Sequence, residues 1–200
     1  RQFAIPTYYY EFDATKDIRR DVTLSQYNVE KDAATSSVNT KMPQTSIKLA
    51  NGKFRKSWTS FSGTVTGTYG VNWPIIRYAD VLLMYAEALN EAGRTADAQA
   101  PATDRNTGGP LNRVRKRAGL DNVTGLSQSA LRARIRKERR LELAFEGSQW
   151  FDILRYDNGA YFVPYLHAIG KTNATTKHML LPIPQKEIDG NKNLVQNPGY

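Results

Sequence analysis

Three glutamates stand four residues apart in the stretch from Ile135 to Tyr156. These residues, Glu138, Glu142 and Glu146, lie inside a run of arginines that ends in large apolar residues. On an α-helix this spacing brings the three carboxylates to one face. Such a column could bind a metal ion or catalyse acid–base chemistry, could belong to a basic helix that binds nucleic acid, or could form a buried scaffold of ion pairs.

The neighbours of the glutamates favour the scaffold. On a helical wheel the three carboxylates lie among the core-facing residues, and most of the basic side chains lie on the other side. A buried carboxylate is costly unless it is paired and hydrogen-bonded. Arg115 and Arg139 are the expected partners, the latter at (i, i+3) and (i, i+7) to Glu142 and Glu146. We therefore predict ion pairs, no catalytic residue and no metal or cofactor; a carboxylate-dependent glycoside hydrolase fragment is a less favoured possibility.

Composition and charge weigh against a metal site and against nucleic-acid binding. The 200 residues include no cysteine, which excludes disulfides and thiolate metal sites, and His167 and His178 match no usual zinc spacing. Residues 111–140 hold ten basic and two acidic residues, a surplus of eight within the net charge of +9. A nucleic-acid-binding module would need such a ridge. The glutamates on the same helix would repel phosphate, so we predict no nucleic-acid partner.

A mainly α fold must position these side chains. Residues 1–72 are predicted to form long irregular loops with short β hairpins, one of them turning at Asn51-Gly52. Residues 73–157 form the helical scaffold, and residues 158–200 form a loop and an extended tail that leads to a short helix. The chain is predicted to be one domain over residues 1–200.

Three helices are expected in the scaffold. The first opens at Pro74 and closes at Gly93, the second opens at Pro110 and ends at Gly119, and a long third helix covers about 127–156. The first helix has a wide apolar face that we expect to be buried. That face consists of Ile75, Tyr78, Val81, Leu82, Tyr85, Ala86 and Leu89.

Several motifs in a fixed order resemble the C-terminal region of the SusD/RagB family. They are RYADVLLMYAEALNEAG (77–93), LNRVRKRAGL (111–120), IRKERRLELAFEGSQWFDILRY (135–156), LLPIPQKEI (180–188) and QNPGY (196–200), with DIRRDV (17–22) and KFRKSW (53–58) as weaker matches. The resemblance implies a SusD-like fold with tetratricopeptide-like helix pairs, in which irregular loops carry the ligand site. It also implies that this chain is the C-terminal domain of a longer protein.

The resemblance implies a function that is not catalytic. Members of the family are outer-membrane lipoproteins of Bacteroidetes-type bacteria, exposed on the extracellular face. They bind glycans, or in some members peptides, and sit on a TonB-dependent transporter. We therefore expect an oligosaccharide ligand, a transporter partner, and an attachment to the membrane only through an N-terminal lipid anchor that this chain lacks.

The expected site residues fall into two groups. The residues that resemble the family most strongly are expected to fasten the helices together through ion pairs. They are Arg77, Arg115, Glu138, Arg139, Glu142, Glu146 and Asp152. A saccharide site needs flat aromatic faces in the loops. Because tyrosine also serves as a packing residue, only some of the aromatic residues are candidates for ligand binding. The ligand-binding candidates are Trp58, Tyr8, Tyr9, Tyr10, Tyr27 and Tyr69, whereas Trp73 is expected to pack at the start of the first helix.

Overall fold

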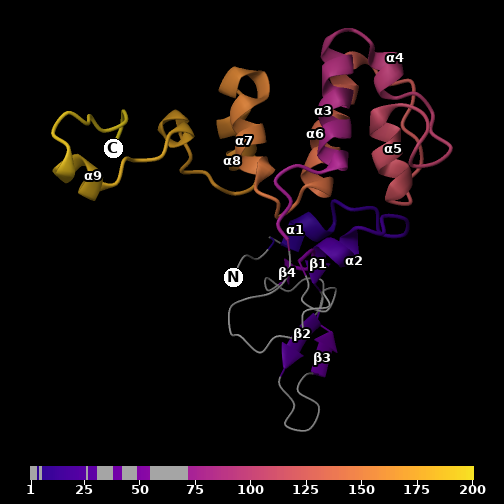
Figure 1. Cartoon of the computed structure of the whole chain (residues 1–200), viewed down its shortest axis with the longest axis horizontal. Helices are drawn as coiled ribbons and strands as arrows, with labels where there is room; N and C mark the ends of the chain where they lie inside the picture. The colour runs from indigo at the N-terminus through magenta and orange to yellow at the C-terminus, as the bar shows by residue number, and fades with distance from the viewer. Residues whose placement is uncertain (1–3, 5, 26, 31–37, 42–48, 55–71) are drawn as a thin grey trace. The chain divides into compact units, whose positions relative to one another are not determined.

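The fold is mainly α, as predicted, and the chain divides into two compact units, Arg1–Phe145 and Glu146–Tyr200 (Figure 1). The computed structural model describes residues 4, 6–25, 27–30, 38–41, 49–54 and 72–200, and of residues 6, 27–30 and 38–41 it describes only the backbone. None of the helices in these ranges is long and apolar enough to cross a membrane.

Four helices form the main core of the first unit. They are α3 (Tyr78–Glu91), α4 (Thr95–Ala98), α5 (Pro110–Arg117) and α6 (Gln128–Glu142), and α3 packs against the other three (Figure 1). Aliphatic side chains from all four helices fill the space between them, which is the main favourable contribution to their packing. The core residues are Ala79, Leu82, Leu83, Ala86, Leu89, Ala98, Leu111, Val114, Leu131 and Ile135.

Local sequence signals set several of the helix ends. Gly93 and Gly119 follow α3 and α5 in the left-handed conformation, at φ of 78° and 81°. After α3, the N–H of Arg94 donates to the Leu89 carbonyl at 2.8 Å, the bond of a Schellman cap. Ser127 begins α6, where its hydroxyl accepts the Ala130 N–H. The predicted boundaries of α5 are therefore confirmed, as is the end of α3.

The predicted start of α3 is wrong, and its predicted buried face is correct only at Leu82, Ala86 and Leu89. The helix begins at Tyr78, so Pro74 lies outside it, and Ile75 is 93% exposed. Tyr78, Val81 and Tyr85, which were expected to be buried, are exposed as well. Contact with α5 and α6 buries a stripe that is rotated toward Ala79 and Leu83, where the alanines let the neighbouring helices approach closely.

The N-terminal part of the first unit combines short helices and two small sheets. Helix α1 (Pro6–Tyr9) and helix α2 (Arg20–Thr23) precede β1 (Leu24–Ser25), which pairs antiparallel with β4 (Ala50–Asn51). A second antiparallel pair joins β2 (Tyr27–Glu30) to β3 (Val38–Lys41), with Tyr27 opposite Lys41.

The expected hairpin turn at Asn51-Gly52 is wrong. Asn51 ends β4, whose partner strand lies much nearer the N-terminus, so that Asn51 stands opposite Leu24. The Asn51 side chain accepts the Lys53 N–H at 2.9 Å, a local bond that an asparagine makes as readily after a strand as within a hairpin turn. The dipeptide therefore marks the end of a strand here.

The prediction of one long helix over about 127–156 is also wrong, because this stretch forms two helices that belong to different units. Helix α6 stops at Glu142, and α7 (Ser148–Arg155) begins the second unit. Phe145 and Gly147 between them have φ of 62° and 86°, which no helix accommodates. Glu146 therefore does not continue the column of Glu138 and Glu142.

The second unit is a short helical array with an ordered tail. After α7 come η2 (Tyr156–Gly159), α8 (Phe162–Ala168), η3 (Thr176–Met179) and α9 (Gln185–Gly190). Phe162 is fully buried and meets the edge of Trp150 at 5.2 Å. The predicted extended segment before the last short helix is confirmed, and Gln196 holds it by bonds to both backbone groups of Ile183.

Candidate functional site

Two buried glutamates on α6 lie at the centre of a cluster of arginines. Glu138 is fully buried, and its Oε2 accepts Arg115 Nη1 at 2.9 Å. Arg19 Nη1 lies 2.7 Å from the other oxygen, Oε1. Arg134, one turn before Glu138 on the same helix, has its Nη2 at 3.8 Å from Oε2. This carboxylate is therefore engaged from three sides.

The second glutamate, Glu142, joins several chain segments to the end of α6. Its side chain accepts Arg19 Nη1 at 3.0 Å and Arg77 Nη1 at 2.6 Å, and it also accepts Arg117 Nη2. Its backbone carbonyl accepts Arg77 Nη2 at 2.6 Å and Lys53 Nζ at 2.5 Å. Burial alone would raise the pKa of the Glu142 carboxyl, but Arg77, Arg117 and Arg19 hold that pKa below its usual value.

Arg19 reaches the cluster because a glycine lets its segment approach α5. The Ile18 N–H donates to the Ala118 carbonyl at 3.1 Å, and a Cβ on Gly119 would lie 2.7 Å from the Lys16 carbonyl oxygen. Asp17 fixes the guanidinium of Arg19 through bonds to Nε and Nη2, at 2.8 and 2.7 Å. Burial lowers the pKa of Arg19, but Asp17, Glu138 and Glu142 raise it above its ordinary value, so the group stays charged.

The remaining expected ion-pair residues lie elsewhere. Arg139 Nη1 donates to Asp80 Oδ1 on α3 at 2.8 Å, a partner that the spacing along α6 did not suggest. In the second unit, Arg155 Nε donates to Asp152 Oδ1 at 3.0 Å. Glu146 lies after the end of α6, partly exposed and in the second unit. Among the described residues, the arginine cluster gathers around Glu138 and Glu142.

The arginine partners explain why this column suits a scaffold better than acid–base chemistry. A general acid or base needs a free lone pair or proton directed toward a substrate, whereas these carboxylates are buried and face guanidinium groups. Among the residues that the structure describes, no group of three or more His, Cys, Asp or Glu residues could hold a metal ion.

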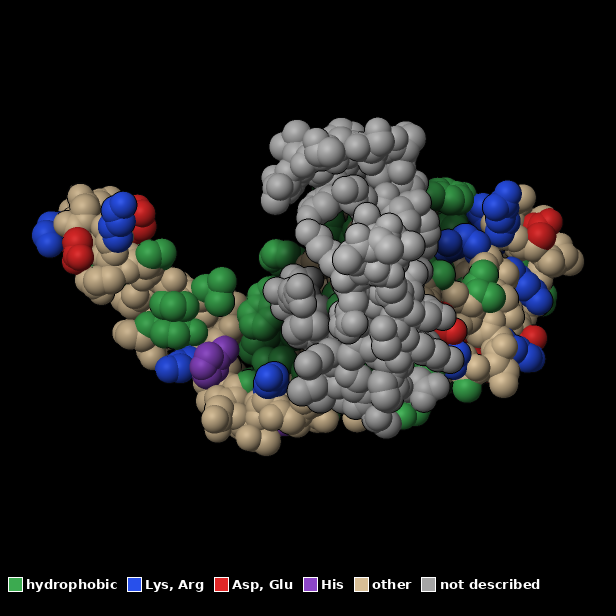
Figure 2. All heavy atoms as spheres, turned by 90° about the horizontal axis from the view of Figure 1, so that it is seen from below, with side chains coloured by type: hydrophobic (Ala, Val, Ile, Leu, Met, Phe, Trp, Pro, Cys, Tyr) green, Lys and Arg blue, Asp and Glu red, His purple; other side chains and the backbone are tan. Residues whose placement is uncertain are grey.

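Many of the basic side chains of residues 111–140, the basic ridge, form ion pairs. At least six of its ten basic side chains face a carboxylate, and Figure 2 shows Lys and Arg side chains beside Asp and Glu side chains on the surface of the first unit. The paired residues are Arg115, Arg117, Arg132, Arg134, Arg139 and Arg140. Paired guanidinium groups attract phosphate less than free ones, so the ridge is weaker as a nucleic-acid surface than its composition indicates.

The three consecutive tyrosines have three different environments. Tyr9 is only 5% exposed and packs in a core cluster with Phe12. Tyr8 is partly buried, and its hydroxyl donates to the Arg140 carbonyl at 2.8 Å. Tyr10 is 62% exposed and meets Tyr9 edge-on at 5.4 Å. Of the three, Tyr10 offers the ring most accessible to a ligand.

An exposed aromatic pair lies where the sequence predicted helix packing. Trp73 is 54% exposed and stacks on Phe54, with ring centroids 4.4 Å apart and an interplanar angle of 21°. Lys53 and Arg77, close to these rings in sequence, both bond the Glu142 carbonyl and so anchor the two segments at the end of α6. Phe54 was not predicted as a candidate, and the packing role expected for Trp73 is wrong because its ring is exposed. Trp58, Tyr69 and the side chain of Tyr27 lie outside the described residues.

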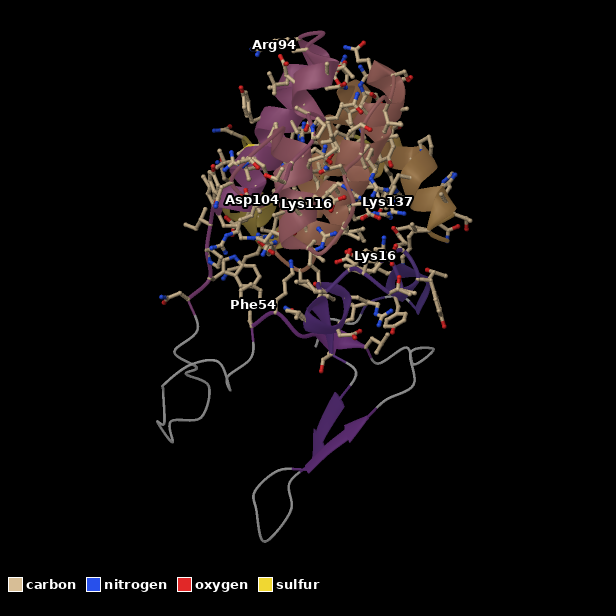
Figure 3. The ribbon with its side chains drawn as sticks, turned by 90° about the vertical axis from the view of Figure 1, so that its right-hand side faces the viewer. Lys16, Phe54, Arg94, Asp104, Lys116 and Lys137 are labelled. Carbon is tan, nitrogen blue, oxygen red and sulfur yellow. The ribbon has the colours of Figure 1, made fainter. Side chains whose placement is uncertain are left out.

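A pocket of about 390 Å³ opens between α3, α5 and the loop that precedes α5. Asp104 of this loop and Lys116 of α5 are labelled in Figure 3. Buried Asn112 holds the chain on either side of α5, because its amide donates to the carbonyls of Gln99, Ala100 and Val123. The pocket is lined by Arg77, Tyr78, Ala79, Leu82, Arg105, Asn106, Arg113, Val114 and Arg117.

Comparisons of the sequence agree with the resemblance of its motifs. The SusD family matches residues 2–200. SusD-like protein P2 of Formosa agariphila is 34% identical over 206 residues, which cover 96% of this chain and 39% of that protein. SusD-like protein P38 of the same organism is 31% identical over 63% of this chain and 24% of its own length. The chain thus spans about two fifths of the first of these relatives.

Solved structures give the same result. A SusD superfamily protein from Parabacteroides distasonis is 26% identical, with a TM-score of 0.69 over 99% of this chain and 42% of that one. Surface glycan-binding protein A from Bacteroides uniformis is also 26% identical, with a TM-score of 0.61 over 94% of this chain and 39% of that one. Since the family match covers nearly every residue, the chain belongs to the SusD family.

Proposed function

We propose that the chain is part of a non-catalytic, cell-surface nutrient-binding protein that binds an oligosaccharide and delivers it to a TonB-dependent transporter. The observation that carries the proposal is the match to the SusD family over residues 2–200, a family of binding proteins. The similarity to a protein named as a surface glycan-binding protein supports a glycan as the ligand. In the same proposal, a lipid anchor holds the full-length protein on the extracellular face of the outer membrane.

In this proposal exposed aromatic rings hold the sugar. The stacked Phe54–Trp73 pair and Tyr10 present open ring faces, against which the C–H groups of a pyranose can pack. Trp58, Tyr27 and Tyr69 remain candidates on sequence alone. Tyr8 would contribute through its partly exposed ring, whereas Tyr9 supports Tyr10 from the core.

The test is a binding screen that also measures turnover. The full-length gene product is titrated with a panel of polysaccharides and with peptides, and each mixture is assayed for new reducing ends and new free amines. We expect saturable binding to at least one polysaccharide without time-dependent product. Binding to peptides alone would instead favour a peptide-binding member of the family. Product formation that is abolished in Glu138→Gln would contradict a binding role.

A further inference from the structure

The pocket between α3 and α5 is positively charged on its walls. Four of its nine lining residues are arginines, Arg77, Arg105, Arg113 and Arg117, and none is acidic. Two acidic residues adjoin lining residues in sequence. Asp80 pairs with Arg139 on α6 at 2.8 Å, and Asp104 Oδ1 accepts the N–H groups of Asn106 and Thr107 at 2.7 and 3.0 Å. The Asp104 carboxylate is therefore occupied in shaping the loop.

Two of the arginines form no ion pair with a carboxylate of the described residues. Arg113 Nη2 donates to the Tyr78 hydroxyl at 2.8 Å, and its Nε donates to the backbone carbonyl of Arg105 at 3.2 Å. Its guanidinium carbon lies 5.5 Å from the centroid of the Tyr78 ring. These neutral partners orient Arg113 without neutralising it. Within the part of the chain that the structure describes, the Arg105 side chain forms no hydrogen bond or ion pair, and it is exposed. The Asn106 N–H and, to a smaller extent, the Arg105 charge lower the pKa of the neighbouring Asp104 carboxyl.

The other two arginines belong to a cluster with more guanidinium groups than carboxylates. Among the described residues, the pairs around Glu138 and Glu142 join five guanidinium groups to three carboxylates. The members are Arg19, Arg77, Arg115, Arg117, Arg134, Asp17, Glu138 and Glu142. The side chains of Arg77 and Arg117 are 26% and 47% exposed, and both line the pocket. The positive side of this cluster therefore reaches the solvent at the pocket.

We infer that this pocket binds an anionic substituent of the glycan, a uronate carboxylate or a sulfate ester, between Arg105 and Arg113, with Arg77 and Arg117 adding positive potential. The inference rests on the proposed function and deepens it by naming the class of saccharide. Guanidinium groups suit such ligands because their planar donors grip two oxygens of one anion.

The remaining walls suit the sugar that carries the charge. Tyr78 is exposed and presents a ring, and Ala79, Leu82 and Val114 supply apolar surface beneath. A volume of about 390 Å³ lies within the range of small-molecule sites. An acidic peptide could satisfy the arginines as well, and the experiment separates it from a saccharide.

The experiment compares matched ligands and matched variants of the full-length gene product by isothermal titration. The ligands are oligogalacturonate and its methyl ester, a sulfated galactan oligosaccharide and its desulfated form, and poly-glutamate. The double variant Arg105→Gln/Arg113→Gln removes the two arginines that form no ion pair with a described carboxylate. The control is Arg94→Gln with a second change, Arg132→Gln, because each of these side chains pairs with a carboxylate and neither lines the pocket. Figure 3 shows Arg94 at the end of the helices away from Phe54.

We expect one charged saccharide to bind more tightly than its neutral form. The pocket variant should weaken that binding roughly 10- to 100-fold, the scale of hydrogen bonds to charged groups, without affecting the neutral form. The control should bind like the wild type, and the affinity should fall as salt rises. Whether the uronate or the sulfate shows this dependence identifies the anion.

Three results would overturn the inference. Equal affinity for charged and neutral saccharides, or an unchanged affinity in the pocket variant, refutes the pocket and leaves the proposed function standing. Tight binding that depends on the pocket arginines but occurs only with poly-glutamate assigns the pocket to acidic peptides instead. Absence of binding to every saccharide in the panel and in the wider screen refutes the inference and the proposed function together. A melting curve for each variant confirms that lost binding is not lost folding.

Discussion

Arg19 Nη1 donates to Glu142 Oε2 at 3.0 Å and so joins side chains that are 123 positions apart in the sequence. The same nitrogen lies 2.7 Å from Glu138 Oε1, and Asp17 grips the other side of the guanidinium. One buried arginine thus fastens the N-terminal segment to α6. Breaking a buried charge pair by removing one partner is costly because the other charge stays buried.

Replacing Arg19 with lysine should destabilise the first unit although the positive charge is kept. A single ammonium group cannot donate to both oxygens of Asp17 and also reach Glu138 and Glu142. We expect the free energy of unfolding to fall by about 1–3 kcal/mol, measured by urea denaturation. Arg94→Lys is the matched control because Arg94 is exposed and pairs with Asp97. Equal stability of the two variants would show that the guanidinium geometry is unimportant.

Removing the carboxylate of Glu142 should have a larger effect. Glu142→Ala leaves Arg19, Arg77 and Arg117 facing one another without their shared counter-ion. We expect a loss of roughly 3–5 kcal/mol in the free energy of unfolding. Glu91→Ala breaks the more exposed pair with Arg132 and should cost less than about 1 kcal/mol. A loss below about 1 kcal/mol for Glu142→Ala would mean that water replaces the carboxylate easily.

The Glu142 carboxylate should make the free energy of unfolding depend on pH. Its pKa in the folded chain lies below the ordinary value of 4.5, because the arginines outweigh the effect of burial. A group of this kind contributes stability that is present above its unfolded pKa and is lost as the pH falls through its folded pKa. We expect the free energy of unfolding to decline on acidification below about 4.5. Glu142→Gln should start lower at neutral pH and decline less steeply, and parallel curves would contradict this assignment.

Local signals in the sequence predicted both ends of α5, the end of α3 and the start of α6, but contacts between distant segments determine the arginine cluster. Pro110, Gly93 and Gly119 act on their own turns, so their effects can be read from a few residues. The break after α6 carries one such signal, Gly147 at a φ of 86°, but Phe145, which adopts a φ of 62°, continues the apolar period of the helix and so led to the prediction of one long helix. Arg19 could not be assigned as a partner because its distance to α6 depends on how the N-terminal segment folds back.

The buried face of α3 shows a second limit of prediction from the sequence. The predicted and the buried faces of this helix share Leu82, Ala86 and Leu89. Periodicity extended the predicted face to Tyr78 and Tyr85 because these large rings carry much hydrophobic surface. The structure instead extends the buried face to Ala79 and Leu83, against α5 and α6. The preference for close helix packing is a property of the partners, which a single stretch of sequence does not contain.

The last prediction separates aromatic residues that bind ligand from those that support the fold. Trp73 and Tyr10 expose their rings, whereas Tyr9 is buried with Phe12. Trp73→Ala in the full-length gene product should weaken glycan binding by roughly 5- to 150-fold, equivalent to about 1–3 kcal/mol for a central aromatic contact. Its melting temperature should barely change, and the sequence-based candidate Trp58→Ala should behave in the same way.

Tyr9→Ala provides the contrast. Loss of this buried ring should lower the free energy of unfolding by about 3–5 kcal/mol, the scale for removing a large aromatic side chain from a core. Tyr10→Ala should leave stability nearly unchanged, because its ring is 62% exposed. Calorimetric melting and glycan titration of Trp73→Ala, Trp58→Ala, Tyr9→Ala and Tyr10→Ala show which of these residues bind ligand and which support the fold. If Trp73→Ala, Trp58→Ala and Tyr10→Ala all bind glycan like the wild type, then the aromatic rings of this part of the chain do not form the saccharide site.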